Sequence, residues 1–538
     1  MSFIGISSGN ILSKMELKRS TKFDHTKKRL KYADENFQLH FSNDENFVSA
    51  EDIVVYFEGK ILNVDIASIP RLYKKYKQHF VEKLIGEFVI ILYDAAKKEL
   101  LLFSDSRNTR KCYYYFKKDF FIFSSNIKNI LRIIKDYSLD KHALIQYLFL
   151  GTTISPNTFF EGILQIASFE IIKIKLNQDY IEKNRYSQDL NFLKKNFDSN
   201  YLKTLFLKSV SERIRNEEKV GIWLSGGIDS SVLVYLASQC GKKINTYTVG
   251  YHNSKIDESK YADIVSEFFD TNQNTIFIDS STIEISPLAL WYYEFPNQNI
   301  MSLVIFPLAQ ASKREKTVLG GAGIEEIFMW GKDYKILNFA NNIPPVNRIG
   351  VKKLPLMCFS FKRNSYQFYK YLDPSKIKNL IQYYSCGKTL IDRYNLLRFW
   401  VWDFEYVPLR QKFANSNILY PFFDERLIKY CRMLSTDKIL FLKLFKDKIP
   451  PEISKRKRQG LAAPSKYWLD EQKDKIDFFV EKFVQRKIVG EREIRKYLGR
   501  PYSNHWNVWS IFSLEVFLEI FFDKKSLDKP VEKLSKLL

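Results

Sequence analysis

The first third of the chain carries short apolar runs separated by polar segments, a spacing typical of strands and turns. We predict strands over Asp52–Phe57 and Glu87–Tyr93, with Gly59 marking a turn after the first. Leu100–Phe103 follows the second strand across the segment AAKKE, which is typical of a hairpin. Further strands are expected at Cys112–Phe116, Asp119–Phe123 and Ile171–Leu176, the last of which should end the β-rich region.

The apolar periodicity fades over Gln188–Ser199, and we place a domain boundary there, between residues 195 and 196. Beyond it, predicted strands alternate with predicted helices, which favours a parallel sheet covered by helices on both faces. After about Asp333 the pattern is mostly helical. The alternating elements are strands at Val220–Leu224, Lys243–Val249 and Lys316–Leu319, and helices at Ser230–Gln239 and Ser259–Phe269.

Composition narrows the class of protein. At 538 residues the chain predicts two or more domains, and 45% hydrophobic residues exclude disorder over most of its length. No apolar run is long enough for a signal peptide or a membrane span, and the five cysteines form no CxxC pair. These features predict a cytoplasmic protein without a disulfide framework or a zinc site.

The net charge of +23 suits RNA, an acidic peptide or an anionic membrane face, but it equally suits solvated lysine-rich surfaces. Charge alone therefore decides nothing about partners.

One segment carries recognisable chemistry. Ser225–Ser231 (SGGIDSS) lies directly between a predicted strand and a predicted helix. Its two glycines allow close approach of the backbone to a polyanion, its serines offer hydroxyl donors, and the helix directs its positive end at phosphate. Asp229 would repel phosphate unless a cation stood between them, so it implies Mg²⁺. No GxxxxGKS or GxxxxGKT loop is present, which excludes a Walker-type NTPase.

This string resembles the pyrophosphate-binding loop of the ATP pyrophosphatase superfamily, whose members adenylate a carboxylate or carbonyl and release pyrophosphate. The resemblance extends in order to asparagine synthetases, and together it covers most of residues 85–470. Upstream, Leu100–Tyr115 and Phe123–Leu131 resemble part of a class II glutamine amidotransferase domain. The synthetase-like segments are Thr248–Tyr251, Asp257–Ala262, Leu319–Phe328, Pro421–Asp424 and Ile449–Gly460.

The resemblance implies the fold and the site. The fold class is an α+β N-terminal sandwich of the Ntn type over residues 1–195. It is followed over residues 196–538 by an α/β parallel-sheet ATP pyrophosphatase domain (adenine nucleotide α-hydrolase-like) with a helical C-terminal extension. Asp229 and Glu325 are expected on Mg²⁺, and Arg458, helped by Lys457, should neutralise charge on the phosphates. The residues expected to bind ATP are Leu224, Ser225, Gly226, Gly227, Asp229, Ser230, Ser231, Val249, Gly250 and Gly321.

Several positions depart from the family pattern. Ser2 stands where class II amidotransferases use cysteine, and the glutamine-binding NGE segment is reduced to Phe57-Glu58-Gly59. A hydroxyl is a weaker nucleophile than a thiolate, so the first domain is expected to have lost glutaminase activity. In the second domain, Ala322 and Asn417 replace family glutamates, and Arg458 replaces the lysine. The ATP-binding end is retained while the acyl-acceptor end is changed.

Relatives with an inactive glutaminase use an amine already present in their substrate, as β-lactam synthetases and lasso peptide macrolactam cyclases do. A basic, aromatic-rich chain suits a peptide, so macrolactam formation on a peptide is the first expectation, with a leader-binding or protease partner implied by the family. Ammonia-dependent asparagine synthesis or another small-molecule amide or β-lactam synthesis is the alternative. A non-catalytic ATP-binding scaffold and a tRNA-modifying enzyme are the remaining alternatives, although a nucleic acid partner fits the first domain poorly. Glu294 and Asp263 either approach the nucleotide or lie on solvated helix faces.

Overall fold

The computed structural model describes most of the chain, with gaps. Of the predictions above, Ser2, Lys457, Arg458, Gly460 and the first part of the helical region expected after Asp333, residues 334–416, lie outside the described residues. The described residues are 3–8, 29–34, 37–41, 44–117, 120–153, 155–176, 180–186, 197–252, 256–297, 299–328, 417–434, 438–456, 463–495 and 505–538.

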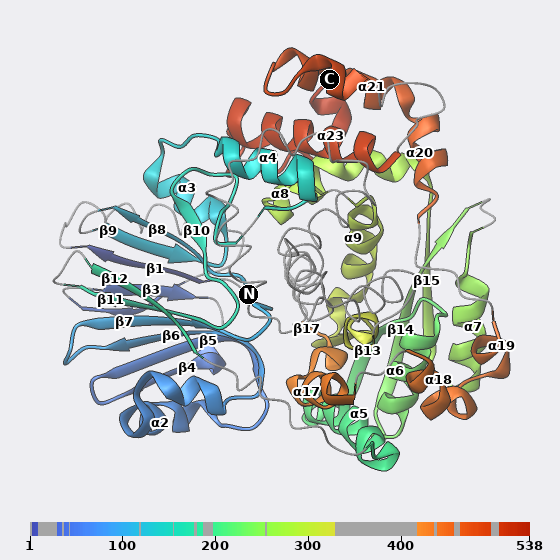
Figure 1. Ribbon diagram of the computed structural model, residues 1–538, viewed down its shortest axis with the longest axis horizontal. Helices are drawn as coiled ribbons and strands as arrows, with labels where there is room; N and C mark the ends of the chain where they lie inside the picture. The colour runs from blue at the N-terminus through green and yellow to red at the C-terminus, as the bar shows by residue number, and fades with distance from the viewer. Residues whose placement is uncertain are drawn as a thin grey trace, which may run out of the picture.

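The first half is a sandwich of two antiparallel sheets, drawn in blue to blue-green in Figure 1. One sheet has the order β10-β8-β9-β1-β3-β2 and the other β12-β11-β7-β6-β5-β4. Their inner faces meet through aromatic rings, for example Phe41 against Tyr56 with centroids 4.4 Å apart. The first sheet comprises β1 Phe3–Ser8, β2 Arg29–Ala33, β3 Phe37–Phe41, β8 Tyr113–Lys117, β9 Phe120–Ser124 and β10 Ile163–Gln165. The second comprises β4 Phe47–Ala50, β5 Ile53–Ile61, β6 Gly86–Asp94, β7 Glu99–Ser104, β11 Glu170–Lys175 and β12 Tyr180–Arg185.

Two predictions for this half were wrong. Gly59 does not mark a turn but lies inside β5, opposite Phe88 of β6, with φ +117°. A Cβ there would lie 1.9 Å from the carbonyl oxygen of Glu87, so the position requires glycine for close strand approach. The β-rich region also continues past Leu176, because the polar segment Tyr180–Arg185 pairs with β11 as an edge strand. The hairpin between β6 and β7 is confirmed.

The second half contains a five-stranded parallel sheet with the order β15-β14-β13-β16-β17. Successive side chains along β13 point into two different cores. Ile222 faces the core shared with α5–α7, and Trp223 faces the core shared with α8 and α9. The parallel sheet covered on both faces is therefore confirmed. The strands are β13 Lys219–Trp223, β14 Lys243–Tyr251, β15 Asn272–Ile278, β16 Thr317–Gly320 and β17 Asn417–Leu419. The helices beside them include α5 Ser199–Ile214, α6 Ile228–Ser238, α7 Ser259–Phe268, α8 Ser286–Tyr293, α9 Met301–Ala311, α17 Glu425–Leu434, α18 Lys438–Phe445 and α19 Pro451–Ser454.

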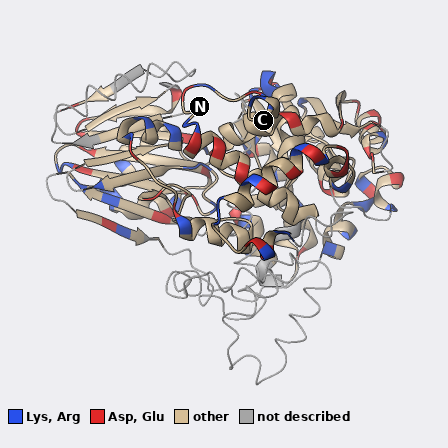
Figure 2. Ribbon diagram, turned by 90° about the horizontal axis from the view of Figure 1, so that it is seen from above, with Lys and Arg blue, Asp and Glu red and all other residues tan. Residues whose placement is uncertain are grey.

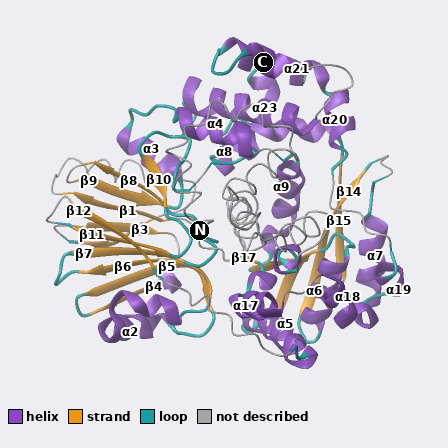
Figure 3. Cartoon of the chain, in the orientation of Figure 1, coloured by secondary structure: helices purple, strands orange, loops and turns teal. Residues whose placement is uncertain are grey.

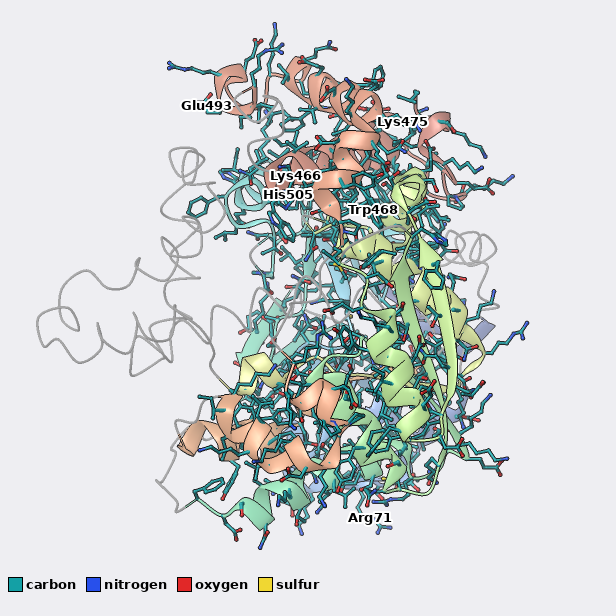
Figure 4. All side chains as sticks on the ribbon, turned by 90° about the vertical axis from the view of Figure 1, so that its right-hand side faces the viewer. Arg71, Lys466, Trp468, Lys475, Glu493 and His505 are labelled. Atoms are coloured by element: carbon teal, nitrogen blue, oxygen red, sulfur yellow. The ribbon has the colours of Figure 1, made fainter. Side chains whose placement is uncertain are left out.

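A helical layer lies beyond one end of this sheet and also contacts the sandwich (Figure 3). Trp468 on α20 packs edge-on against Tyr251 at the end of β14, with centroids 5.8 Å apart, and Figure 4 shows Lys466 and His505 near Trp468. Helices α3 and α4 of the first half share a core with α8, α9 and α23. This layer comprises α3 Ile127–Ile134, α4 Lys141–Leu150, α20 Ser465–Glu471, α21 Lys473–Gln485, α22 Glu491–Arg495 and α23 His505–Leu518.

Charged residues of both signs are interspersed along the helices of the second half in Figure 2. No helix among the described residues combines the length and the apolar character needed to cross a membrane.

Candidate active site

The predicted ATP loop lies where the strand order of the parallel sheet reverses. Trp223, the last residue of β13, pairs with Tyr247 of β14 on one side and Gly320 of β16 on the other. After β13 the chain runs through α6 to β14 and β15 on one side, and β16 is placed on the opposite side. In open α/β sheets, ligands bind in the crevice outside the carboxyl ends of strands at this reversal. Ser225–Ser231 occupies that position.

The loop is shaped by its own glycines and serines. Gly226 has φ +69°, and a Cβ there would lie 2.7 Å from the backbone nitrogen of Ala262. The hydroxyl of Ser230 accepts a hydrogen bond from the backbone N–H of Ser225 at 3.2 Å. Ser230 and Ser231 both donate to the carbonyl oxygen of Gly227, at 3.0 and 2.8 Å. These bonds hold an open turn that leads into α6, whose first residues carry Asp229.

Asp229 has one paired and one unpaired carboxylate oxygen. Its Oδ2 lies 2.7 Å from Nζ of Lys438, the first residue of α18, whose side chain is only 3% exposed. Its Oδ1 is buried and accepts no hydrogen bond from any residue that the structure describes. A buried carboxylate oxygen without a donor is costly unless a cation binds it, so the environment of Asp229 fits the expected Mg²⁺. Lys438 was not among the predicted site residues.

The glycine loop after β16 packs directly on the start of α6. A Cβ on Gly321 would lie 3.2 Å from the backbone of Ser230, so the two loops touch through their main chains. Gly323 has φ +121° and leads into the short helix α10, Ile324–Ile327. Glu325 lies in this helix, although its side chain is outside what the structure describes. The predicted metal residues therefore come from neighbouring elements of one crevice.

On the other side of the loop, β14 carries the positions predicted to meet adenine. Thr248 donates from its hydroxyl to the carbonyl of Leu224 at 2.6 Å, which ties β14 to the start of the ATP loop. Val249 and Gly250 follow on the same strand. The ring of Phe277 covers Gly250 so closely that a Cβ would lie 2.6 Å from it, and this ring is 48% exposed.

Arg456 connects the segment that precedes Lys457 and Arg458 to the ATP loop. Its guanidinium lies 3.8 Å from the ring centroid of Tyr261 and pairs with Glu258. Its Nη1 also donates to the carbonyl oxygen of Gly226 at 3.5 Å. The segment thus ends against the phosphate side of the loop, immediately before the two predicted catalytic residues.

Two other candidates are placed elsewhere. Glu294 is buried and accepts hydrogen bonds from the backbone N–H groups of Ile127 and Lys128, both at 2.9 Å. It therefore contacts the N-terminus of α3, where a carboxylate is favoured, and does not lie on a solvated helix face. Asp263 is exposed on α7.

Cys112 is the only cysteine among residues 1–195 of the sequence. It is fully buried, and burial raises the pKa of its thiol well above the usual value. The nearby charge of Glu58 raises this pKa further, by a smaller amount. A buried, protonated thiol cannot act as the nucleophile of a glutaminase.

Comparison with known proteins finds a similar family in each half of the chain. Residues 201–384 match the family model described as asparagine synthase, and residues 62–187 match the glutamine amidotransferase domain. Asparagine synthetase (glutamine-hydrolysing) 1 of Bacillus subtilis is 21% identical over 566 residues, covering 92% of this chain and 87% of that protein. Amidase chry2 of Gibberella zeae is 24% identical over 294 residues, 49% of this chain and 43% of its own length. Among solved structures, NMN synthetase from Francisella tularensis is 13% identical, and the match covers 61% of this chain and 97% of that protein. Its TM-score of 0.25 is too low to support any inference.

Proposed function

Because this chain is an asparagine synthetase-like, ATP-dependent carbon–nitrogen ligase, we propose that it forms an amide bond within a peptide. A carboxylate of the peptide attacks the α-phosphorus of ATP, the bond between the α-phosphorus and the bridging oxygen breaks, and pyrophosphate leaves. An amine of the same peptide then attacks the acyl carbon, AMP leaves, and one proton is lost. The product is lighter than the peptide by one water.

The observation that carries the ligase proposal is the loop at the end of β13. It combines backbone positions suited to phosphate with Asp229, whose Oδ1 is buried and has no donor within the described part of the chain. Asp229 and Glu325 would hold Mg²⁺, which supplies positive charge to the phosphates when bound. Ser225–Ser231 and α6 would bind and orient the leaving pyrophosphate, and Arg458 with Lys457 would neutralise its developing charge.

Two features support an amine from the substrate itself over ammonia released from glutamine. The only thiol within residues 1–195 is buried on Cys112. Asn417, where the family has a glutamate at the acyl-acceptor end, accepts a hydrogen bond from Arg110 of the first half. Amide formation then depends mainly on holding an amine against the adenylate, for which a peptide provides the necessary contact area.

Synthesis of asparagine from aspartate and ammonia is the second candidate. It is favoured by the relative named asparagine synthetase, which aligns over 92% of this chain.

Pyrophosphate release from Mg·ATP distinguishes these candidates. The full chain and an Asp229→Ala control would be assayed with a small peptide encoded beside its gene, with aspartate plus ammonia, and with aspartate plus glutamine. Peptide-dependent release with a product lighter by one water supports the proposal. Release with aspartate and ammonia alone would replace it with asparagine synthesis, and turnover with glutamine would overturn the assignment of an inactive first half.

A further inference from the structure

Two buried side chains of the first half hold the last strand of the parallel sheet. Arg110, on the segment between β7 and β8, donates from Nη2 to Oδ1 of Asn417 and, at 3.5 Å, to the carbonyl oxygen of Ile418. Glu87, on β6, accepts from the backbone N–H of Tyr420 at 3.3 Å. Arg110 is 5% exposed and Glu87 is 3% exposed, so the bonds to Ile418 and Tyr420 are shielded from water, while the bond to Asn417 is partly buried.

The same contacts continue into α5. Nε of Arg213 lies 2.8 Å from Glu87, and its Nη1 lies 3.0 Å from Asp424. The residues after β17 are therefore held from both sides by charged groups, Glu87 before Pro421 and Arg213 after Phe423. Charged hydrogen bonds in a dry interface are the strong, directional kind that fix a segment in one place.

This held segment lies directly against the glycine loop of the ATP crevice. A Cβ on Gly320 would lie 2.5 Å from the ring of Tyr420, and one on Gly323 would lie 2.9 Å from Phe422. Gly321, between them, packs against the backbone of Ser230. A displacement of β17 and the residues after it would therefore move the glycine loop relative to α6, because closely packed main chains have no empty space into which they could shift independently.

We propose that Arg110 and Glu87 are positioning residues for nucleotide binding. The amidotransferase-like half holds β17 and the residues after it through these two side chains. The ring of Tyr420 and the backbone of Phe422, which both pack against the glycine loop, then set the distance between that loop and Ser225–Ser231. This role rests on the proposed function only for the identity of the nucleotide.

General stabilisation by the interface is the competing explanation, and a matched control separates the two. Lys128 and Glu294 form a similarly buried ion pair between the same halves, 3.2 Å apart, with side chains 8% and 0% exposed. Glu294 accepts hydrogen bonds from the backbone N–H groups of Ile127 and Lys128 in α3, so its contact with the first half is made at α3 and not through Arg110 or Glu87. Glu294→Gln therefore weakens the interface without touching the proposed route.

The test uses the full chain with Arg110→Ala, Arg110→Lys and Glu294→Gln. Hydrogen–deuterium exchange is followed in peptides covering residues 316–328, and the dissociation constant of Mg·ATP is measured by calorimetry. We expect Arg110→Ala to accelerate exchange in this segment and to weaken Mg·ATP binding about tenfold, the size of one lost charged hydrogen bond. Arg110→Lys, which retains one charged donor, should recover most of the affinity. Glu294→Gln should change exchange at α3 and leave the affinity within about twofold.

Asn417→Ala provides a second variant in case Arg110→Ala does not fold, since Asn417 is only partly buried. The proposal is overturned if exchange over residues 316–328 is unchanged in Arg110→Ala or Asn417→Ala, or if Glu294→Gln weakens nucleotide binding equally. A third outcome is that exchange accelerates as expected in the variants but the wild type binds no Mg·ATP. That outcome would contradict the proposed function, while the positioning of the glycine loop by Arg110 would still hold.

Discussion

Nζ of Lys438 lies 2.7 Å from Oδ2 of Asp229, so the carboxylate expected to bind Mg²⁺ is also the partner of a buried lysine. The two residues are 209 positions apart. The ion pair satisfies one carboxylate oxygen, and among the described residues none donates to the other, which suits a site where a cation and a lysine flank the same phosphate chain.

Replacing Lys438 tests this pairing. Lys438→Met should lower the free energy of unfolding by about 1–3 kcal/mol, because Asp229 would lose its charged partner. Adding Asp229→Asn should recover most of that loss, since no buried charge then remains unpaired. Urea unfolding of the wild type, both single variants and the double variant measures the coupling. Additive effects of the two substitutions would show that the pair does not interact.

Gly226→Ala tests the geometry of the ATP loop. The new Cβ would be strained at φ +69° and would also lie 2.7 Å from the backbone of Ala262. Gly241→Ala is the matched control, because Gly241 has φ +64° and nothing within 4 Å of its Cβ position. Both variants should lose about 1 kcal/mol of stability from backbone strain. Only Gly226→Ala should weaken Mg·ATP binding, by about tenfold or more, and equal affinities of the two variants would argue against the loop as the nucleotide site.

Arg456→Ala tests the contact between the segment preceding Lys457 and the ATP loop. Without the guanidinium over the ring of Tyr261, the interaction that holds this segment against the loop should weaken by about 1 kcal/mol. The KM for ATP should therefore rise about fivefold. Arg456→Lys should recover little, since an ammonium does not reproduce the planar stack. Steady-state pyrophosphate release at varied ATP measures the effect. Lys455→Ala, at an exposed neighbouring position, serves as control, and an equal rise in KM there would point to charge alone.

Asp424 predicts how stability depends on acid pH. Burial alone would raise its pKa, but hydrogen bonds from Arg426 and the charges of Arg213 and Arg426 outweigh burial and lower the pKa from 3.8 to about 2. A carboxyl whose pKa is lower in the folded state stabilises the fold above pH 3.8, and this contribution is lost as the pH falls toward 2. The loss should be about 2 kcal/mol.

Urea midpoints between pH 5 and pH 2 would measure this contribution. Asp424→Asn should be less stable than the wild type at pH 5, and the difference should shrink as the pH falls. Asp279→Asn is the control, because Asp279 is exposed and its pKa is lowered chiefly by hydrogen bonds from Ser281. The interpretation would be wrong if the wild type and Asp424→Asn lost stability in parallel over this range.

The sequence alone determined the nucleotide loop, because its chemistry is contiguous. Ser225–Ser231 places glycines, hydroxyls and a carboxylate within one turn between a strand and a helix, and these elements form as predicted. The strands β6, β7 and β13 were equally predictable, since apolar runs bounded by turn residues need no distant information. The polar strand β15 (NQNTIFI) was missed, because its pairing with β14 overrides its weak local preference.

Tertiary structure alone decided which distant charges belong to the crevice. Lys438 is one of 84 Lys and Arg residues and carries no local signal that distinguishes it from the rest. Arg456 lies in a segment that resembles the family, but its contacts with Tyr261 and Gly226 depend on the tertiary structure. The solvated position considered for Glu294 was wrong, because its carboxylate is buried against α3. Asn417 is bonded to Arg110, which lies 307 positions earlier. Such contacts depend on how two halves of the chain pack together, whereas a motif depends on neighbours along the chain, so the motif could be predicted and the partners could not.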